Sequence, residues 1–334
     1  MLSSVRRGFL SRSFHTTCKA YTTSYDGTPK PLISTSASSA SYKADMPSVK
    51  LPYDKYSPSG TTTNNPLIFL HGLFGSKSNT RTVSKKLAEL LNRDVYCLDL
   101  RNHGNAPHAP THEYLGMCSD VEKFICDHGL NEANGLGLSG SVDGPIVIGH
   151  SMGGKVAMGI SLRKPELIGG IIVVDNAPVG FTKGFSQFGK YVQALKKIER
   201  MGGTLKSLKD CDAVLAEVEP NDGVRQFLMT NLKRRQGGKD GYYCRVPLDV
   251  MGKGLDNVAD WPFQESENCR YSGPSLFVRG TKSLYVADEY LAVIGKFFPR
   301  FEVRDVDAGH WLISEKPDEF IQAVVDWVEI KEDQ

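Results

Sequence analysis

One stretch sets the fold of this chain: Ile146-Val147-Ile148-Gly149-His150-Ser151-Met152-Gly153-Gly154. Its apolar, β-branched start is typical of a buried strand, and residues 153–163 have the apolar spacing of a helix. Between them lies the pattern G-x-S-x-G, in which glycines let strand and helix pass close together and a tight turn exposes the serine hydroxyl. An isolated match would fit an ordinary Gly-rich turn equally well. In this strand–turn–helix context we predict that Ser151 is a nucleophile.

Segments on both sides of this motif repeat the same alternation of strand and helix. The apolar, strand-like runs are residues 66–70, 95–99, 145–148, 168–174, 275–279 and 301–306. The segments with helical spacing are residues 83–91, 117–127, 153–163, 287–297 and 317–328. This order predicts an α/β fold, with a mainly parallel central sheet and helices on both faces.

The alternation stops between residues 178 and 268. Apolar residues there fall at helical spacing, and no apolar strand run separates them. We therefore predict a helical cap over residues 178–268, inserted into a core made of residues 48–177 and 269–334. Residues 26–47 are rich in Ser, Thr, Ala and Pro and are predicted to be a flexible linker.

The first 25 residues have a composition of their own. They contain four basic residues and no acid, and Ser and Thr are abundant. This composition is typical of a mitochondrial presequence, and the apolar run of a secretory signal is missing. We predict that residues 1–25 are a presequence and that the protein is mitochondrial; the alternative is a disordered basic tail.

Charge and composition exclude several other classes of protein. The chain has 40 Lys+Arg against 38 Asp+Glu, and 36 against 38 without the four basic residues of the N-terminus. Such a balance argues against a nucleic-acid partner. The longest apolar stretches, such as residues 171–174, are too short to span a bilayer. Seven Cys without a C-x-x-C pair predict reduced thiols and no zinc site, and we expect neither a metal nor a bound cofactor.

A serine nucleophile needs a general base, and the sequence offers one. Of the eight histidines only His310 follows Ser151. It lies after the predicted strand 301–306 and before the last predicted helix, which agrees with the chain order nucleophile, acid, base. A surface histidine without catalytic role is the alternative. We predict that His310 is the base.

The acid that holds the base is less obvious. A G-x-x-D turn after the strand 275–279 would be a common place for it, but this chain has Ser283 there. Asp175 follows the strand 168–174, at the carboxyl edge of the sheet where catalytic groups collect. We therefore predict Asp175 as the acid. Asp288, which suits the first turn of a helix, is the alternative.

Two backbone N–H groups are expected to form an oxyanion hole. One is that of Met152, directly after the nucleophile. The other comes from the turn after the first predicted strand, where Leu73 is preferred over Phe74. The nearby segment Asp99 to His103 contains a histidine, but we predict a supporting role for it, with Asp99 and Arg101 bracing the loop through hydrogen bonds.

These motifs together resemble one branch of the α/β-hydrolases. That branch includes bacterial esterases, mitochondrial abhydrolase-domain proteins and yeast ethanol acetyltransferases. The resemblance covers roughly residues 50–330 and implies the α/β-hydrolase fold, with the acid on the strand before the cap, as at Asp175. The matching segments are His71 to Lys77, Asp99 to His108, Gly149 to Lys155, Val174 to Pro178, and Ala308 to Trp311.

The triad implies acyl transfer through an acyl-serine. The resemblance favours an ethanol O-acetyltransferase, with acetyl-CoA as the donor substrate, ethanol as the acceptor, and thioesterase and esterase side reactions. A mitochondrial ester or thioester hydrolase is one alternative, and a hydrolase-like interaction partner of matrix proteins is another. No motif identifies a CoA site. The basic residues Lys233, Arg234 and Arg235 are interpreted as a solvated helix end. Contact of these residues with the phosphates of CoA is the less favoured alternative.

Overall fold

The computed structural model describes residues 22–23, 29–30, 41–60, 62, 65–132, 144–181, 185–235, 241–263 and 269–332. The chain divides into two units, Met1–Ser36 and Ala37–Gln334. In the first unit, β1 (Thr22–Thr23) and β2 (Pro29–Lys30) pair antiparallel. The rest of the predicted presequence lies outside the described residues.

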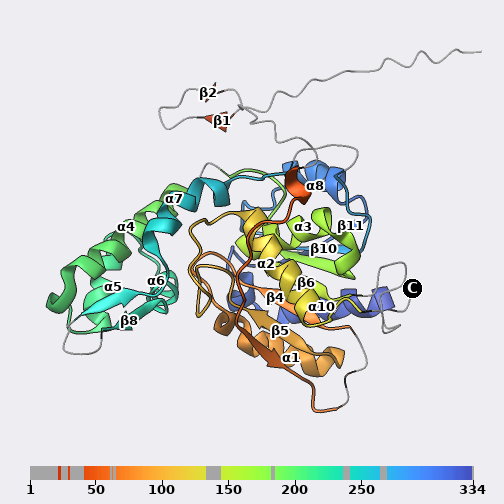
Figure 1. Cartoon of the computed structure of the whole chain (residues 1–334), viewed down its shortest axis with the longest axis horizontal. Coiled ribbons are helices and arrows are strands. Elements are labelled where there is room, and N and C mark those ends of the chain that lie inside the picture. Colours follow the sequence, from red (N-terminus) through yellow and green to blue (C-terminus); the bar gives the residue numbers. More distant parts are fainter. Residues whose placement is uncertain are drawn as a thin grey trace, which may run out of the picture. The chain divides into compact units, whose positions relative to one another are not determined.

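The second unit is built on one seven-stranded sheet (Figure 1). From edge to edge its strands are β11 (Phe301–Val306), β10 (Ser275–Gly280), β7 (Gly170–Val174), β6 (Ile146–His150), β4 (Leu67–Leu70), β5 (Val95–Leu98) and β3 (Tyr53–Tyr56). All neighbouring pairs are parallel except β3 with β5. The predicted, mainly parallel sheet is thus confirmed. Strand β3 was not predicted, because its four residues Tyr-Asp-Lys-Tyr alternate between exposed and half-buried and form no apolar run.

Helices cover both faces of this sheet, and alternate strand residues feed two separate cores. On one face pack α1 (Arg81–Leu91) and α10 (Pro317–Glu332), whose Trp327 is fully buried. On the other pack α2 (Tyr114–Asp127), α3 (Met152–Arg163) and α8 (Leu291–Phe297). Each fully buried large apolar side chain contributes on the order of 1.5–3 kcal/mol. In the described part of the chain, none of the helices is long and apolar enough to cross a membrane.

The cap lies between β7 and β10 and is mainly helical. Its helices are α4 (Phe185–Met201), α5 (Leu208–Ala216), α6 (Asp222–Met229) and α7 (Leu248–Ala259). It also contains an antiparallel ribbon, β8 (Leu232–Arg234) with β9 (Tyr242–Cys244). The interpretation of Lys233 to Arg235 as a helix end is therefore wrong. Each of these strands has only three residues, and two of the three in β8 are exposed and charged, so neither strand leaves a long apolar run in the sequence.

Two side chains of the core hold the end of α7. Tyr114 Oη donates a hydrogen bond to the carbonyl of Val258 (2.7 Å). Lys155 Nζ, on α3, donates to the carbonyls of Ala259 (3.2 Å) and Asp260 (2.9 Å). A cation at the carboxyl end of a helix interacts favourably with its dipole. Burial lowers the pKa of the Lys155 ammonium to about 7. The cap is thus anchored on the same helix that begins at the predicted nucleophile.

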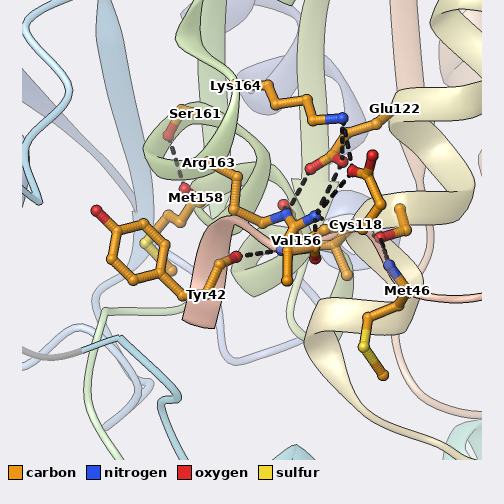
Figure 2. A network of polar contacts seen from close by, with 12 residues as sticks. Tyr42, Met46, Cys118, Glu122, Val156, Met158, Ser161, Arg163 and Lys164 are labelled. Carbon is orange, nitrogen blue, oxygen red and sulfur yellow. Dashed lines mark hydrogen bonds and ion pairs between the residues drawn. The ribbon is translucent and has the colours of Figure 1, made fainter. Parts of the chain in front are cut away.

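The segment 42–49, here called the N-terminal strap, packs on the core (Figure 2). The guanidinium of Arg163 pairs with Glu122 (2.7 Å) and also donates to the carbonyls of Tyr42 and Ala44. The Arg163 side chain is fully buried, so these carbonyls complete its set of acceptors.

A second buried pair fixes the other end of the strap. Arg101 binds Asp120 (2.6 Å) and donates to the carbonyl of Pro47 (2.9 Å), and the N–H of Val49 donates to Asp120 (2.7 Å). The prediction of a flexible linker up to residue 47 is therefore wrong for residues 42–47. Composition misses this segment because most of its bonds to the core use backbone carbonyl and N–H groups, which do not depend on residue type.

Removing the strap should destabilise the protein, while removing only the residues before it should not. A chain starting at residue 41 keeps all these bonds. A chain starting at residue 50 removes acceptors from two buried guanidinium groups, which should lower the free energy of unfolding by about 1–3 kcal/mol for each group. We expect its melting temperature to fall by roughly 5 °C or more relative to the longer chain. Thermal unfolding of both variants measures this, and equal melting temperatures would contradict it.

Candidate active site

Ser151 lies at a sharp turn between β6 and α3. Its backbone has φ 53° and ψ −115°, a left-handed φ that is strained for a residue with a side chain. The flanking glycines are required by close approach. A Cβ on Gly149 would lie 2.1 Å from the carbonyl oxygen of Gly153, and one on Gly153 would lie 2.5 Å from that of Leu70. No other residue fits either position without moving the backbone.

Hydrogen bonds from neighbouring chain segments hold this turn in place. The N–H of Ser151 donates to the carbonyl of Val174 (2.9 Å), at the end of β7. The side-chain amide of Asn176 donates to the carbonyl of Ser151 (2.9 Å). The strained serine is thus fixed from both sides by the segment that also carries Asp175.

The three predicted side chains meet at this point. Ser151 Oγ lies 3.0 Å from His310 Nε2, and His310 Nδ1 lies 2.7 Å from Asp175 Oδ2. The carboxylate of Asp175 is fully buried, whereas His310 keeps 16% of its side chain exposed. With a proton on Nδ1, the imidazole donates to the carboxylate and its Nε2 can accept the serine proton. This is the geometry of a nucleophile, general base and orienting acid.

Asp175 receives further hydrogen bonds from the turn after β10. The N–H of Gly280 donates to Oδ1 (3.0 Å), and Ser283 Oγ donates to Oδ2 (2.5 Å). Ser283 occupies the position of the Asp in a G-x-x-D turn, and it donates a hydrogen bond to the acid on the neighbouring strand. The alternative, Asp288, pairs with Arg279 and its side chain is 85% exposed. It does not contact His310.

Aromatic rings enclose His310. Tyr285 stacks on its imidazole with ring centroids 4.2 Å apart. The ring of His150 lies 5.1 Å away, and His150 Nε2 donates to the carbonyl of His310 (2.9 Å). Burial, with a smaller contribution from His310, lowers the pKa of His150 to about 4. His150 is therefore neutral near pH 7 and orients the base without competing for its proton.

The second predicted oxyanion donor lies in the turn Gly72–Gly75, which the N–H of Gly75 closes on the carbonyl of Gly72 (2.9 Å). The N–H of Phe74 donates to His103 Nε2 (3.1 Å), so it is not available to an oxyanion. In the described residues, the N–H groups of Leu73 and Met152 donate to no protein acceptor. The geometry thus favours Leu73 over Phe74, as predicted.

The segment after β5 supports this turn, but not in the way expected. Asp99 accepts from the N–H groups of Lys77 and Asn105, both at 2.8 Å, which agrees with a bracing role. Arg101 instead binds Asp120 and the N-terminal strap, away from the turn. The contact to the turn comes from His103. Burial lowers the pKa of His103 to about 3, so its Nε2 stays an acceptor near pH 7.

A pocket opens over Ser151. Its polar wall contains Ser151, His310 and residues of the turn Gly72–Gly75, and its roof contains Phe188 of α4 and Phe227 of α6. Trp311 packs edge-on against Phe227 with ring centroids 4.7 Å apart. Sequence periodicity placed apolar residues in the cap but could not tell which of them face the serine. The other lining residues are His71, Asn79, Thr80, His150, Ile313 and Ser314.

A family model described as the alpha/beta hydrolase family matches residues 67–323. The chain belongs to the alpha/beta hydrolase family. Among solved structures, a marine microorganism esterase superposes with a TM-score of 0.73 and 30% identity, covering 84% of this chain and 99% of that one. The fold class predicted from the motifs is therefore confirmed.

Curated relatives of this alpha/beta hydrolase fall into the predicted branch. A probable alcohol acetyltransferase of Saccharomyces cerevisiae is 45% identical over 280 residues, covering 80% of this chain and 78% of the relative. An sn-1-specific diacylglycerol lipase of Mus musculus is 35% identical, covering 88% and 90%. Ethanol acetyltransferase 1 of Wickerhamomyces anomalus is 30% identical, covering 84% and 75%.

Removing any member of the triad should abolish most of the activity. We expect Ser151→Ala, Asp175→Asn and His310→Ala each to lower kcat for a short acyl ester by roughly 10³-fold or more, with a residual rate from the oxyanion hole. Asp288→Asn is the matched control and should keep its rate, because its carboxylate only pairs with Arg279. Loss of activity in Asp288→Asn with retention in Asp175→Asn would overturn the assignment of the acid.

Proposed function

We propose that this protein is an alcohol O-acetyltransferase that makes ethyl acetate from acetyl-CoA and ethanol through an acetyl-Ser151 intermediate. The observation that carries the proposal is the 45% identity to a probable alcohol acetyltransferase over 280 residues. The assembled triad and the apolar roof over it support the same conclusion. Thioesterase and esterase reactions follow when water takes the place of the alcohol.

In the first half-reaction Ser151 Oγ attacks the acetyl carbonyl while its proton moves to His310 Nε2, 3.0 Å away. The N–H groups of Leu73 and Met152 stabilise the negative charge on the carbonyl oxygen. Collapse of this intermediate breaks the C–S bond, and the imidazolium protonates the departing thiolate of CoA. Asp175 stabilises the positive charge of His310 throughout.

In the second half-reaction the acetyl group moves from Ser151 to ethanol, and His310 again acts as the base. Ethanol gives its proton to His310 Nε2, and its oxygen attacks the acetyl-enzyme. Ethyl acetate leaves as Ser151 takes the proton back. With water as the nucleophile the product is acetate, and no side chain has to change its role.

To compete with water for the acetyl-enzyme, the alcohol must be bound and oriented at the site, because bulk water is roughly 55 M and an alcohol is far more dilute. Phe188 and Phe227 in the roof and Trp311 beside them offer apolar contacts that an ethyl group can make and water cannot. Such a cap also limits the water that reaches the acetyl-enzyme. Oriented binding can supply large effective molarities, and this is the advantage we assign to the alcohol.

A hydrolase without alcohol transfer is the second candidate. It is favoured by the 35% identity to the mouse diacylglycerol lipase and by the 30% identity to the marine esterase. Both candidates use the same acyl-serine, so they differ only in the fate of the acyl-enzyme.

Adding ethanol to the purified protein and acetyl-CoA should divert turnover from acetate to ethyl acetate. Because both products come from one acetyl-enzyme, Ser151→Ala should abolish them together. Quantifying acetate and ethyl acetate over an ethanol series measures the partition. Acetate alone at high ethanol would establish the hydrolase, and the absence of turnover with any ester or thioester would contradict both candidates.

We also propose a mitochondrial location, on the basis of the acid-free N-terminal 25 residues with their four basic side chains. Deleting residues 2–25 should leave the protein in the cytosol with its activity intact, because the N-terminal strap begins only at residue 42. Cell fractionation with an activity assay tests this. Import of the shortened chain at the level of the full chain would refute it.

A further inference from the structure

Phe74 occupies an unusual backbone position in the oxyanion turn. Its φ is 61°, which places it in the left-handed region at the third position of the turn that runs from Gly72 to Gly75. This is the geometry of a type II turn, where glycine is the preferred residue. For a bulky side chain such a φ is strained and persists only where the surroundings enforce it.

Several hydrogen bonds hold this turn from different directions. The carbonyl of Gly72 accepts from His71 Nδ1 (2.8 Å) and from the N–H of Gly75 (2.9 Å). In a planar trans peptide the C=O and the N–H point in opposite directions. Fixing the Gly72 carbonyl therefore turns the N–H of Leu73 to the opposite side, and both residues line the pocket at Ser151.

The peptide groups of Phe74 are held on both sides, and the two partners come from different parts of the protein. Its N–H donates to His103 Nε2 (3.1 Å), which belongs to the core. Its carbonyl accepts from Asn231 Nδ2 (2.8 Å), which belongs to the cap. Asn231 is fully buried and lies between α6 and β8.

The cap holds Asn231 firmly. Its N–H donates to the carbonyl of Leu228 at the end of α6 (3.1 Å), and its carbonyl accepts from the N–H of Arg245 after β9 (2.9 Å). The Oδ1 atom of Asn231 has no hydrogen-bond partner in the described part of the chain. Burying an amide oxygen without a partner costs free energy. Nδ2 makes the hydrogen bonds of this side chain: a shorter one to the carbonyl of Phe74 (2.8 Å) and a longer one to the carbonyl of Leu228 within the cap (3.4 Å).

We propose that Asn231 is a positioning residue of the oxyanion hole, through which the seated cap holds the Phe74 peptide and thereby aims the N–H of Leu73 at the substrate carbonyl oxygen. This inference rests on acyl transfer through Ser151, but not on whether alcohol or water accepts the acyl group. Without the Asn231 bond the buried carbonyl of Phe74 has no donor, and the strained turn relaxes. Leu73 then moves out of line with the developing oxyanion.

The chain offers a matched control at the other end of α6. Asn221 caps the N-terminus of this helix by accepting from the N–H of Val224 (3.2 Å), and it makes no contact with Phe74. Asn221→Ala should therefore weaken the same part of the cap and leave the turn intact. Asn231→Leu and Asn231→Asp both remove the donor; the second keeps the size of the side chain in case the first does not fold.

The test compares these variants in hydrolysis of p-nitrophenyl acetate and in inhibition by a short trifluoromethyl ketone. The ketone adds to Ser151 and places an oxyanion in the hole. For both Asn231 variants we expect kcat to fall by roughly 10–100-fold, KM to stay within about threefold, and the Ki of the ketone to rise by the factor lost in kcat. Asn221→Ala should lower the melting temperature and keep kcat and Ki.

Three results would overturn the inference while the wild-type enzyme stays active. The first is an unchanged kcat in folded Asn231 variants. The second is a loss of kcat/KM that comes from a raised KM, with an unchanged Ki. The third is an equal loss of kcat in Asn221→Ala. A wild-type protein that neither hydrolyses the ester nor binds the ketone would instead refute acyl transfer through Ser151, and the inference with it.

Discussion

The close approach of strand β6 to helix α3 at Ser151 is the constraint on which the site depends. Carbonyl oxygens of Gly153 and Leu70 occupy the space that side chains at residues 149 and 153 would need. At this close approach Ser151 adopts a strained, left-handed φ of 53°. Asp175, at the end of the neighbouring strand, has a φ of 51°. Two adjacent strands thus break from extended geometry at the same edge of the sheet, which turns a nucleophile and an acid toward one histidine.

The triad can be predicted from the sequence because each member follows a recognisable strand: Ser151 and Asp175 follow the buried, mainly apolar strands β6 and β7, and His310 follows β11, in which residues 301, 303 and 306 are apolar. Strand ends of a parallel sheet share one edge, so chain order and spacing suffice to bring Ser151, Asp175 and His310 together. The role of Ser283 could also have been found. A polar residue at the usual position of the acid, with the acid on the neighbouring strand, is placed to donate a hydrogen bond to it, as Ser283 does to Asp175.

Other parts of the fold leave no such signal. Strands β3, β8 and β9 have only three or four residues each, and β3 and β8 contain exposed charged side chains, so none of them shows the apolar run of four or more residues by which strands are recognised. The N-terminal strap is held mainly through its backbone carbonyl and N–H groups, which carry no information about residue type. The positions of Arg101 and His103 in the chain do not reveal their partners, which depend on the distant groups that lie within reach after folding. Arg101 pairs with the buried carboxylate of Asp120, and His103 accepts the hydrogen bond from the turn.

The cap contacts the turn Gly72–Gly75 at Phe74, and this contact connects the shape of the pocket to the geometry of the turn. The ring of Phe74 stacks on Phe188 of the cap, with centroids 6.4 Å apart, while its backbone carbonyl accepts from Asn231. Phe188 also lines the pocket. A change in the cap that moves Phe188 therefore acts on the turn Gly72–Gly75 as well as on the pocket. The shape of the pocket and the geometry of the turn are coupled, because Phe74 contacts the cap through both its ring and its carbonyl.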